Sequence, residues 1–311
     1  MSIDFSLGEE ADAIAQTLKR FARDQAGGAV VPCARFSPDL WRKLCGLEIF
    51  SLTGAKEIVA VMEALGKTNF PGPLATTFAA AQLFEGDDRA RIVSGEMLVA
   101  MGELHGDGLF PWAAIAQRFV WCERDRAFAA RAISIEPVET LGCEPWGKVR
   151  LERESEFRHA GRALAIADIA LGAYLAQAGR YLVEAASEHA KTRTQFGRPI
   201  GDYQAVAHAL ARCATELAAA AALTRVAAHS FDAERKNCRV TSAAAKVSAG
   251  KAANSASQVV HQVFGAFGVT EEGPVFPVAR RIRQLTLTPG ADATARAHLL
   301  EHVGLIRSES V

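Results

Sequence analysis

The sequence lacks three features that would each point to a particular class of protein: excess charge, a long apolar run and paired cysteines. Its 35 Lys and Arg residues balance 35 Asp and Glu residues, so no net charge attracts nucleic acid or an anionic membrane. The longest apolar runs, such as residues 218–223, are far shorter than the roughly 20 residues that cross a bilayer. None of the six cysteines belongs to a CxxC pair, so no zinc or disulfide framework is expected. The first ten residues carry acidic side chains and no basic one, unlike the cationic start of a secretory signal. We therefore expect a soluble, cytoplasmic protein without nucleic-acid or membrane partners.

The length and composition predict a protein with several packed units. A chain of 311 residues exceeds the roughly 250–300 residues that one hydrophobic core usually serves. Half of the residues are hydrophobic and 23% are charged, which is enough apolar material for large cores. Alanine, the best helix former, becomes dense after residue 159. We expect a mainly α-helical protein with a small β insert: an N-terminal helical domain (1–91), a short β domain (92–156) and a C-terminal antiparallel helical bundle (157–311).

Hydrophobic periodicity places the individual elements. Apolar residues recur at three, four or seven positions in the C-terminal half, which is typical of one buried face on each of several helices. The predicted helices of this half span residues 158–190, 203–232, 240–264 and 291–306. The same pattern predicts helices at residues 9–23 and 58–65, and short apolar runs predict strands at residues 97–101, 119–122 and 132–135.

The densest group of ligand-binding side chains is the loop 193–204, RTQFGRPIGDYQ, which joins two long predicted helices. Arg193 and Arg198 carry planar guanidinium groups suited to a diphosphate. Phe196 offers a ring for stacking, and Gln195 can bind an amide-rich heterocycle. A solvated turn is an equally good interpretation of the loop when it is taken alone, because Gly, Pro and Arg are ordinary loop residues.

A second segment, QVFGAFGV at residues 262–269, closes the third long helix with glycines that permit close approach of a ligand or cap the helix. The two segments together, in an alanine-rich bundle, resemble the C-terminal domain of the acyl-CoA dehydrogenase family. In that family the loop R-x-Q-F-G-x-P-I-x-x-F-Q and the segment Q-x-x-G-G-x-G donate FAD contacts across a subunit interface. By position, the resemblance implies FAD contacts from Arg193, Gln195, Phe196, Gln262 and Gly265.

The resemblance extends more weakly into the N-terminal half. Residues 1–21 and the run MEALG at residues 62–66, followed by PGPL at residues 71–74, are similar to the family's first helical domain. The departures within the FAD segments are Tyr203, in place of phenylalanine, and Ala266, in place of the second glycine. Alanine adds a methyl group where the family's backbone approaches the dinucleotide.

Two features that the family uses for catalysis are missing from the sequence. The middle domain is short, and residues 106–112 stand where full-length members have a T-E-P-x-x-G-S-D run. The catalytic base, a glutamate near the start of the last helix, is replaced by Pro289. In some members the glutamate lies on the first long helix of the bundle, at a position that aligns with Ala167. Neither side chain can accept a proton. The carboxylates nearest to these two positions in the sequence, and therefore the remaining candidates for a base, are Asp168 and Asp292.

Both carboxylates have structural interpretations as well. Asp168 lies on the apolar stripe of its helix, where it is either a displaced base or half of an ion pair, and we favour the ion pair. Asp292 is better interpreted as a residue of the first turn of the last helix, where its charge meets the helix dipole.

Two further groups could bind ligands but have simpler interpretations. His298 and His302 are four residues apart on the last predicted helix, but no suitable third ligand is evident, so we expect no metal site. The basic run RRIR at residues 280–283 could reach a CoA phosphate or an acidic partner, and we favour a solvated helix face narrowly.

The resemblance implies FAD-dependent α,β-desaturation of acyl-CoA thioesters, with an electron-transfer acceptor. Because the base and much of the flavin cover are missing, we expect this chain to donate FAD contacts to a longer catalytic acyl-CoA dehydrogenase subunit. It would then resemble the short subunits of α2β2 enzymes that oxidise steroid side-chain CoA thioesters. One alternative is a self-sufficient homo-oligomer that uses Asp168 or Asp292 as its base. Another is an FAD-free structural or acyl-CoA-binding module.

Overall fold

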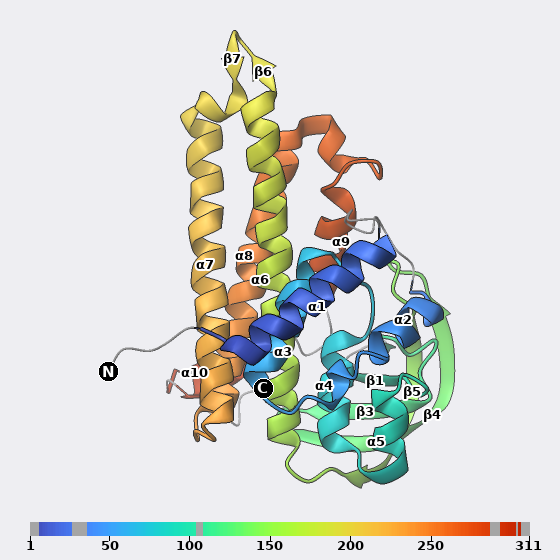
Figure 1. Ribbon diagram of the computed structural model, residues 1–311. Coiled ribbons are helices and arrows are strands. Elements are labelled where there is room, and N and C mark those ends of the chain that lie inside the picture. The colour runs from blue at the N-terminus through green and yellow to red at the C-terminus, as the bar shows by residue number, and fades with distance from the viewer. Residues whose placement is uncertain (1–5, 27–35, 104–107, 287–292, 303, 306–311) are drawn as a thin grey trace.

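The computed structural model describes residues 6–26, 36–103, 108–286, 293–302 and 304–305 (Figure 1). Helices, then a small sheet, then long helices follow one another along the chain, which confirms the expected fold class. The long helices form a bundle, and the N-terminal helices and the sheet lie beside one half of it (Figure 1). The exact domain limits after residues 91 and 156 stay predictions.

The N-terminal part consists of short helices. Their bounds are α1 Glu9–Ala26, α2 Pro38–Cys45, the 3₁₀ turn η1 Ile49–Ser51, α3 Ala55–Lys67, α4 Leu74–Leu83 and α5 Gly86–Val93. The predicted helices at residues 9–23 and 58–65 correspond to α1 and α3. Helix α2 begins where the Ser37 hydroxyl accepts a hydrogen bond from the backbone N–H of Leu40, with Pro38 in the first turn.

The sheet has five strands in the order β1-β3-β4-β5-β2. Their bounds are β1 Val99–Gly102, β2 Leu109–Phe110, β3 Arg118–Glu123, β4 Arg126–Val138 and β5 Trp146–Glu156. Strands β1 and β3 are parallel and the other neighbours are antiparallel. Side chains of β1 and β3 form a core with helices α4 and α6, so the sheet is anchored to the helical parts of the protein.

The C-terminal part is the bundle. Its elements are α6 Ala160–Thr192, β6 Thr194–Gln195, β7 Arg198–Pro199, η2 Ile200–Asp202, α7 Gln204–Asp232, α8 Cys238–Phe264, η3 Gly265–Val269, α9 Phe276–Thr286 and α10 Ala293–His302. Helices α6, α7 and α8 begin and end within two residues of the predicted bounds. Small side chains bring them close: a Cβ atom on Gly179 of α6 would lie 3.2 Å from the Cα of Ala253 on α8.

Polar contacts join the N-terminal helices to the bundle. The Asp232 carboxylate, at the end of α7, accepts hydrogen bonds from the backbone N–H groups of Ala55 (2.7 Å) and Lys56 (3.2 Å) at the start of α3. It therefore caps α3 from another part of the chain. Arg225 of α7 makes a forked contact with both carboxylate oxygens of Glu63 on α3.

Helix α7 is, among the described helices, the one that is long and apolar enough to cross a bilayer by length and composition. We did not expect such a helix from the short apolar runs of the sequence. Helix α7 packs against α6 and α8 within the bundle, and only 22% of its apolar window is buried. Most of this alanine-rich window is therefore exposed in the chain taken alone, and an exposed apolar face of this kind marks a contact with another protein or with a membrane.

The basic run at residues 280–283 corrects one prediction. We favoured a solvated helix face, but Arg280 and Arg281 on α9 are 6% and 3% exposed. Arg281 pairs with the buried Glu144 of the β4–β5 loop at 3.6 Å, and Arg280 pairs with Glu271 at 3.4 Å. Burial of each guanidinium group is possible because a carboxylate lies beside it. The sequence does not reveal this pairing, because both carboxylates lie outside the basic run.

Candidate functional site

The predicted FAD loop forms a hairpin at one end of the bundle, between α6 and α7 (Figure 1). Strands β6 and β7 pair at two positions, and Phe196 and Gly197 form the tip with φ of 51° and 82°. At the base, the N–H of Arg193 donates to the carbonyl of His189 (2.9 Å), and the N–H of Ile200 donates to the carbonyl of Arg193 (2.8 Å). From the sequence alone, a solvated turn was an equally good interpretation of this loop. The structure shows a hairpin that these two hydrogen bonds close at its base.

The fold brings the two predicted FAD segments together. Gln195, Phe196 and Gln262 line one groove of about 560 Å³ between the hairpin, α7 and α8. Most of the remaining lining is apolar, with side chains from η2, α7 and α8. Gly265 follows Gln262 by less than one turn, ends α8 with φ of 61°, and leaves the space beside it open to an added Cβ atom.

The polar groups of this region are accessible. Phe196 is 95% exposed, and Arg193, Gln195 and Gln262 are exposed as well. Arg193 forms no ion pair with any described residue. The donor set of one guanidinium group, two amides and one unstacked ring fits the diphosphate and ring systems of a flavin dinucleotide.

Tyr203, a departure from the family pattern, has a local role. Its hydroxyl group donates a hydrogen bond to the carbonyl of Gln195 (3.1 Å), and the guanidinium group of Arg198 lies 4.1 Å from the centre of its ring. These contacts hold the hairpin against the start of α7. The second departure, Ala266, is exposed.

A ring stack links the hairpin to the end of α8. The imidazole of His189 lies parallel to the ring of Phe264, with centroids 4.3 Å apart. Partial burial and the nearby charge of Arg193 lower the pKa of His189, which favours the neutral form of the stacked imidazole. The backbone of His189 also holds Arg193, so this residue couples both predicted FAD segments.

Asp168 is half of an ion pair, the interpretation that we favoured. It is 4% exposed on α6, and its two oxygens contact Arg239 and Lys246 of α8, the latter at 2.8 Å. Arg239 also binds the Asp125 carboxylate at 2.9 Å. Burial alone would raise the pKa of Asp168, but the charges of Lys246 and Arg239 outweigh it and hold that pKa below its ordinary value.

The other positions considered for catalysis give less information. Ala167 is half-buried and packs against the core between the sheet and α4. Pro289 and Asp292 lie outside the described residues, as do the side chains of His298 and His302 on α10. Within the described part of the chain, no cluster of three His, Cys, Asp or Glu side chains could hold a metal ion.

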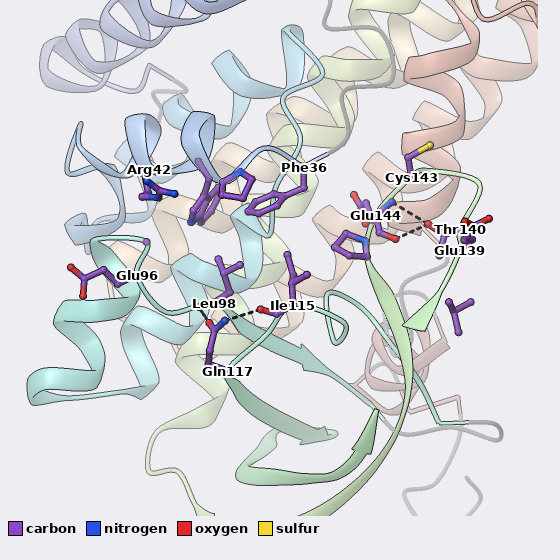
Figure 2. Close-up of a pocket in the computed structure, with 15 residues that line it drawn as sticks. Phe36, Arg42, Glu96, Leu98, Ile115, Gln117, Glu139, Thr140, Cys143 and Glu144 are labelled. Atoms are coloured by element: carbon purple, nitrogen blue, oxygen red, sulfur yellow. Dashed lines mark hydrogen bonds between the residues drawn. The ribbon is translucent and has the colours of Figure 1, made fainter. Parts of the chain in front are cut away.

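A second cavity, of about 810 Å³, lies between the N-terminal helices and the sheet (Figure 2). Its walls come from the start of α2, the α5–β1 turn, the segment before β3 and the β4–β5 loop. Sequence reasoning did not identify it, because no local pattern joins these four segments.

The C-terminal half of the chain matches a known family. Residues 157–304 fit the family model described as acyl-CoA dehydrogenase, C-terminal domain. The match assigns this half of the chain to the acyl-CoA dehydrogenase C-terminal domain. The match spans α6 to α10 and includes the hairpin and the end of α8, the two segments on which the resemblance was based.

The curated proteins that this chain resembles include dehydrogenases of CoA thioesters. Glutaryl-CoA dehydrogenase of Desulfococcus multivorans is 38% identical over 112 residues, which is 36% of this chain and 27% of that protein. Acyl-CoA dehydrogenase IpdE2 of Mycobacterium tuberculosis is 27% identical over 287 residues, 85% of this chain and 88% of the relative. The chain spans less than half the length of several curated relatives that it matches.

Solved structures show the same fold. The ChsE4–ChsE5 complex of Mycobacterium tuberculosis contains a chain with a TM-score of 0.81 at 20% identity, and the alignment covers 98% of this chain and 100% of that one. This acyl-CoA dehydrogenase fold thus extends over the N-terminal helices and the sheet as well as over the bundle.

Proposed function

We propose that this chain is a subunit of an FAD-dependent acyl-CoA dehydrogenase that donates FAD contacts to a longer, catalytic partner subunit. The reaction of the assembly is α,β-desaturation of an acyl-CoA thioester. The observation that carries the proposal is the groove that Gln195 and Phe196 of the exposed hairpin line together with Gln262 of α8, with the exposed Arg193 at the base of the same hairpin.

The exposure of this group supports a site that another chain completes. The Phe196 ring lies at a tip with positive φ, makes an edge contact with Tyr203 (centroids 6.5 Å apart) and stays 95% exposed, so it buries little surface in its own chain. Arg193, Gln195 and Gln262, which provide a cationic group and two amides, are exposed as well. A single groove wall of this kind can bind one side of a dinucleotide, and the other side must come from elsewhere.

The roles of the residues follow from their chemistry. Arg193 would pair with the FAD diphosphate, Phe196 would pack on a ring, and Gln195 and Gln262 would hydrogen-bond to polar edges. Gly265 would leave room for the cofactor beside the end of α8. FAD, when bound, supplies the hydride acceptor of the reaction.

The state of Asp168 supports placing the base on the partner. A general base must reach the proton that it removes and must have free lone pairs at the reacting atom. Asp168 is 4% exposed, and a cation occupies each of its oxygens. A self-sufficient enzyme that used Asp168 would have to break this arrangement, which makes that alternative the weaker one.

The proposed partner is a longer acyl-CoA dehydrogenase chain, and the proposed assembly is a heterotetramer. The heteromeric ChsE4–ChsE5 complex, whose chain shares this fold, supports an assembly of unlike subunits. The alanine-rich face of α7, next to the groove, is a suitable subunit-contact surface because small side chains let another helix approach closely.

The test is the Arg193→Ala variant of the complex co-expressed with its longer acyl-CoA dehydrogenase partner. Loss of one charge-assisted contact with the diphosphate should weaken FAD retention about tenfold or more. The measurement is the ratio of flavin to protein absorbance after gel filtration. Arg180→Ala is the matched control, because Arg180 is an exposed arginine within α6, the helix that precedes the hairpin, more than three turns before Arg193.

Two results would contradict the proposal. Unchanged FAD retention by Arg193→Ala would remove the assigned role of the hairpin. Failure of the wild-type chain to bind either FAD or a longer dehydrogenase subunit would favour an FAD-free structural or acyl-CoA-binding module.

A further inference from the structure

Helix α7 lies at the outer edge of the bundle and has two unlike sides (Figure 1). Its inward side, which includes Leu210, Cys213 and Leu217, is buried against α6 and α8. Its outward side is exposed over the first half of the helix, from Gln204 to Ala219. Only 22% of the apolar window of α7 is buried, so this outward side is a large apolar surface of the chain.

A row of small and polar side chains runs along the centre of the outward side. Its members recur at intervals of three or four residues, which places them on one line along a helix. They are Gln204, His208, Ala211, Thr215, Ala218 and Ala222. The alanines of this row allow a second helix to approach closely, as in the seam of a coiled coil.

Two opposite charges lie beside this row. Arg212 follows Ala211 and Glu216 follows Thr215, so both lie on the same flank of the row, about one turn apart. Both side chains are exposed, and neither forms an ion pair within the described part of the chain. A cation that precedes an anion by four residues is the less favourable order for a pair within one helix. The two charges are therefore available to a partner.

The spacing of these charges is complementary to itself. When two identical helices pack antiparallel around a two-fold axis, each flank faces the same flank of the other copy. Arg212 and Glu216 lie two residues on either side of position 214. An axis at that level places Arg212 of each copy opposite Glu216 of the other, which gives two equivalent ion pairs. The same axis places Ala211 of one copy beside Ala218 of the other.

The same charges disfavour a membrane as the partner. Arg212 and Glu216 lie in the middle of the exposed half of α7, where a bilayer would surround them with hydrocarbon. Helix α7 is also packed along α6 and α8, so it cannot span a bilayer as a separate helix without leaving the bundle.

We propose that the outward side of α7 is a two-fold contact between two copies of this chain, in which the helices run antiparallel and Arg212 of each copy pairs with Glu216 of the other. The hairpins at the start of α7 then lie at opposite ends of the contact, roughly 30 Å apart along the helices. Both FAD grooves can then accept a longer subunit. The contact does not require FAD, so its failure and the failure of the proposed function are separate results.

The test is sedimentation equilibrium of the full chain, purified alone, over a series of concentrations. We expect the wild-type chain to form a dimer reversibly. Arg212→Glu and Glu216→Arg each place like charges opposite one another at two positions, so each should weaken the dimer about tenfold or more. The double variant Arg212→Glu/Glu216→Arg restores both pairs in reversed order and should return the dimer constant to near the wild-type value. A contact with an unlike partner would not be restored, because the charges of that partner stay unchanged.

A packing variant and a matched control complete the experiment. Ala211→Trp places a large ring in the central row and should abolish the dimer, with circular dichroism as the check that the variant folds. Arg180→Glu reverses an exposed charge on α6 and should leave the dimer constant unchanged. The proposal is overturned if the wild-type chain stays a monomer, whether it then binds phosphatidylcholine vesicles or only a longer subunit. It is also overturned if the single charge reversals have no effect or if the double variant does not restore the dimer.

Discussion

The buried ion pair of Asp168 gives the sharpest prediction about this protein, the effect of Asp168→Asn. Asparagine keeps the volume of the side chain but removes its charge. Arg239 and Lys246, whose side chains are 17% and 12% exposed, would then lose their shared counter-charge. Removal of one partner from a buried ion pair typically costs about 3–5 kcal/mol. Arg239 keeps its contact with Asp125, so we expect the low end, about 3 kcal/mol.

The assay is thermal unfolding followed by circular dichroism at pH 7.5. The entropy of unfolding of a 311-residue chain is about 0.65 kcal/mol/K, so a loss of about 3 kcal/mol should lower the midpoint by roughly 4–6 °C. Asp125→Asn is the matched control: its side chain is 57% exposed and shares Arg239, so it should cost less than about 1 kcal/mol.

The pH dependence follows from the direction of the pKa shift. The folded state lowers the pKa of Asp168, so its stabilising effect is fully present above the unfolded pKa of about 3.9 and is lost as pH falls through the folded value. The difference in stability between wild type and Asp168→Asn should therefore shrink below about pH 4. The reasoning is refuted if Asp168→Asn is as stable as wild type at pH 7.5 and the reconstituted enzyme loses turnover, because that result would identify a catalytic base.

Two further substitutions test the packing of the helices and the buried carboxylate of the β4–β5 loop. Gly66→Ala should destabilise the protein by about 2 kcal/mol, because the new Cβ atom would lie 2.5 Å from the carbonyl oxygen of Tyr174 on α6. Gly161→Ala is its control: the space around Gly161 is open, so this variant should be neutral or slightly stabilising in the same thermal assay. Arg281→Met should cost about 3–5 kcal/mol at pH 8, since it leaves Glu144 buried without its cation. Burial already raises the pKa of Glu144, and loss of the opposing charge raises that pKa further. The loss of stability caused by Arg281→Met should therefore be smaller at pH 5.5, where the carboxyl group of Glu144 is protonated more readily. An equal loss of stability at both pH values would contradict this explanation.

The bundle and its FAD loop could be predicted because their signals are local. Alanine density and helical periodicity gave α6, α7 and α8 almost to the residue. The loop RTQFG carries its chemistry within five positions, so its function class could be proposed without knowing the hairpin geometry. The position of Asp168 on the apolar stripe of its helix favoured an ion pair over a displaced base, and the structure shows the pair.

The parts that could not be predicted depend on contacts between distant segments. Nothing near Asp168 in the sequence identifies Arg239, 71 residues later, as its partner. Arg281 looked solvated because its partner Glu144 belongs to the β4–β5 loop, which lies far from Arg281 in the sequence. The cavity beside Trp41 was missed for the same reason, since its walls meet only when the sheet packs on the N-terminal helices.

The flavin content of this chain, purified alone and purified with its longer partner, tests the central claim most directly. The measurement is the ratio of absorbance at the flavin and protein bands of each sample after gel filtration. The account predicts a colourless isolated chain and a yellow complex, because the exposed hairpin offers one side of an FAD site. Stoichiometric FAD in the isolated chain would contradict it and would show that this chain completes its own flavin pocket.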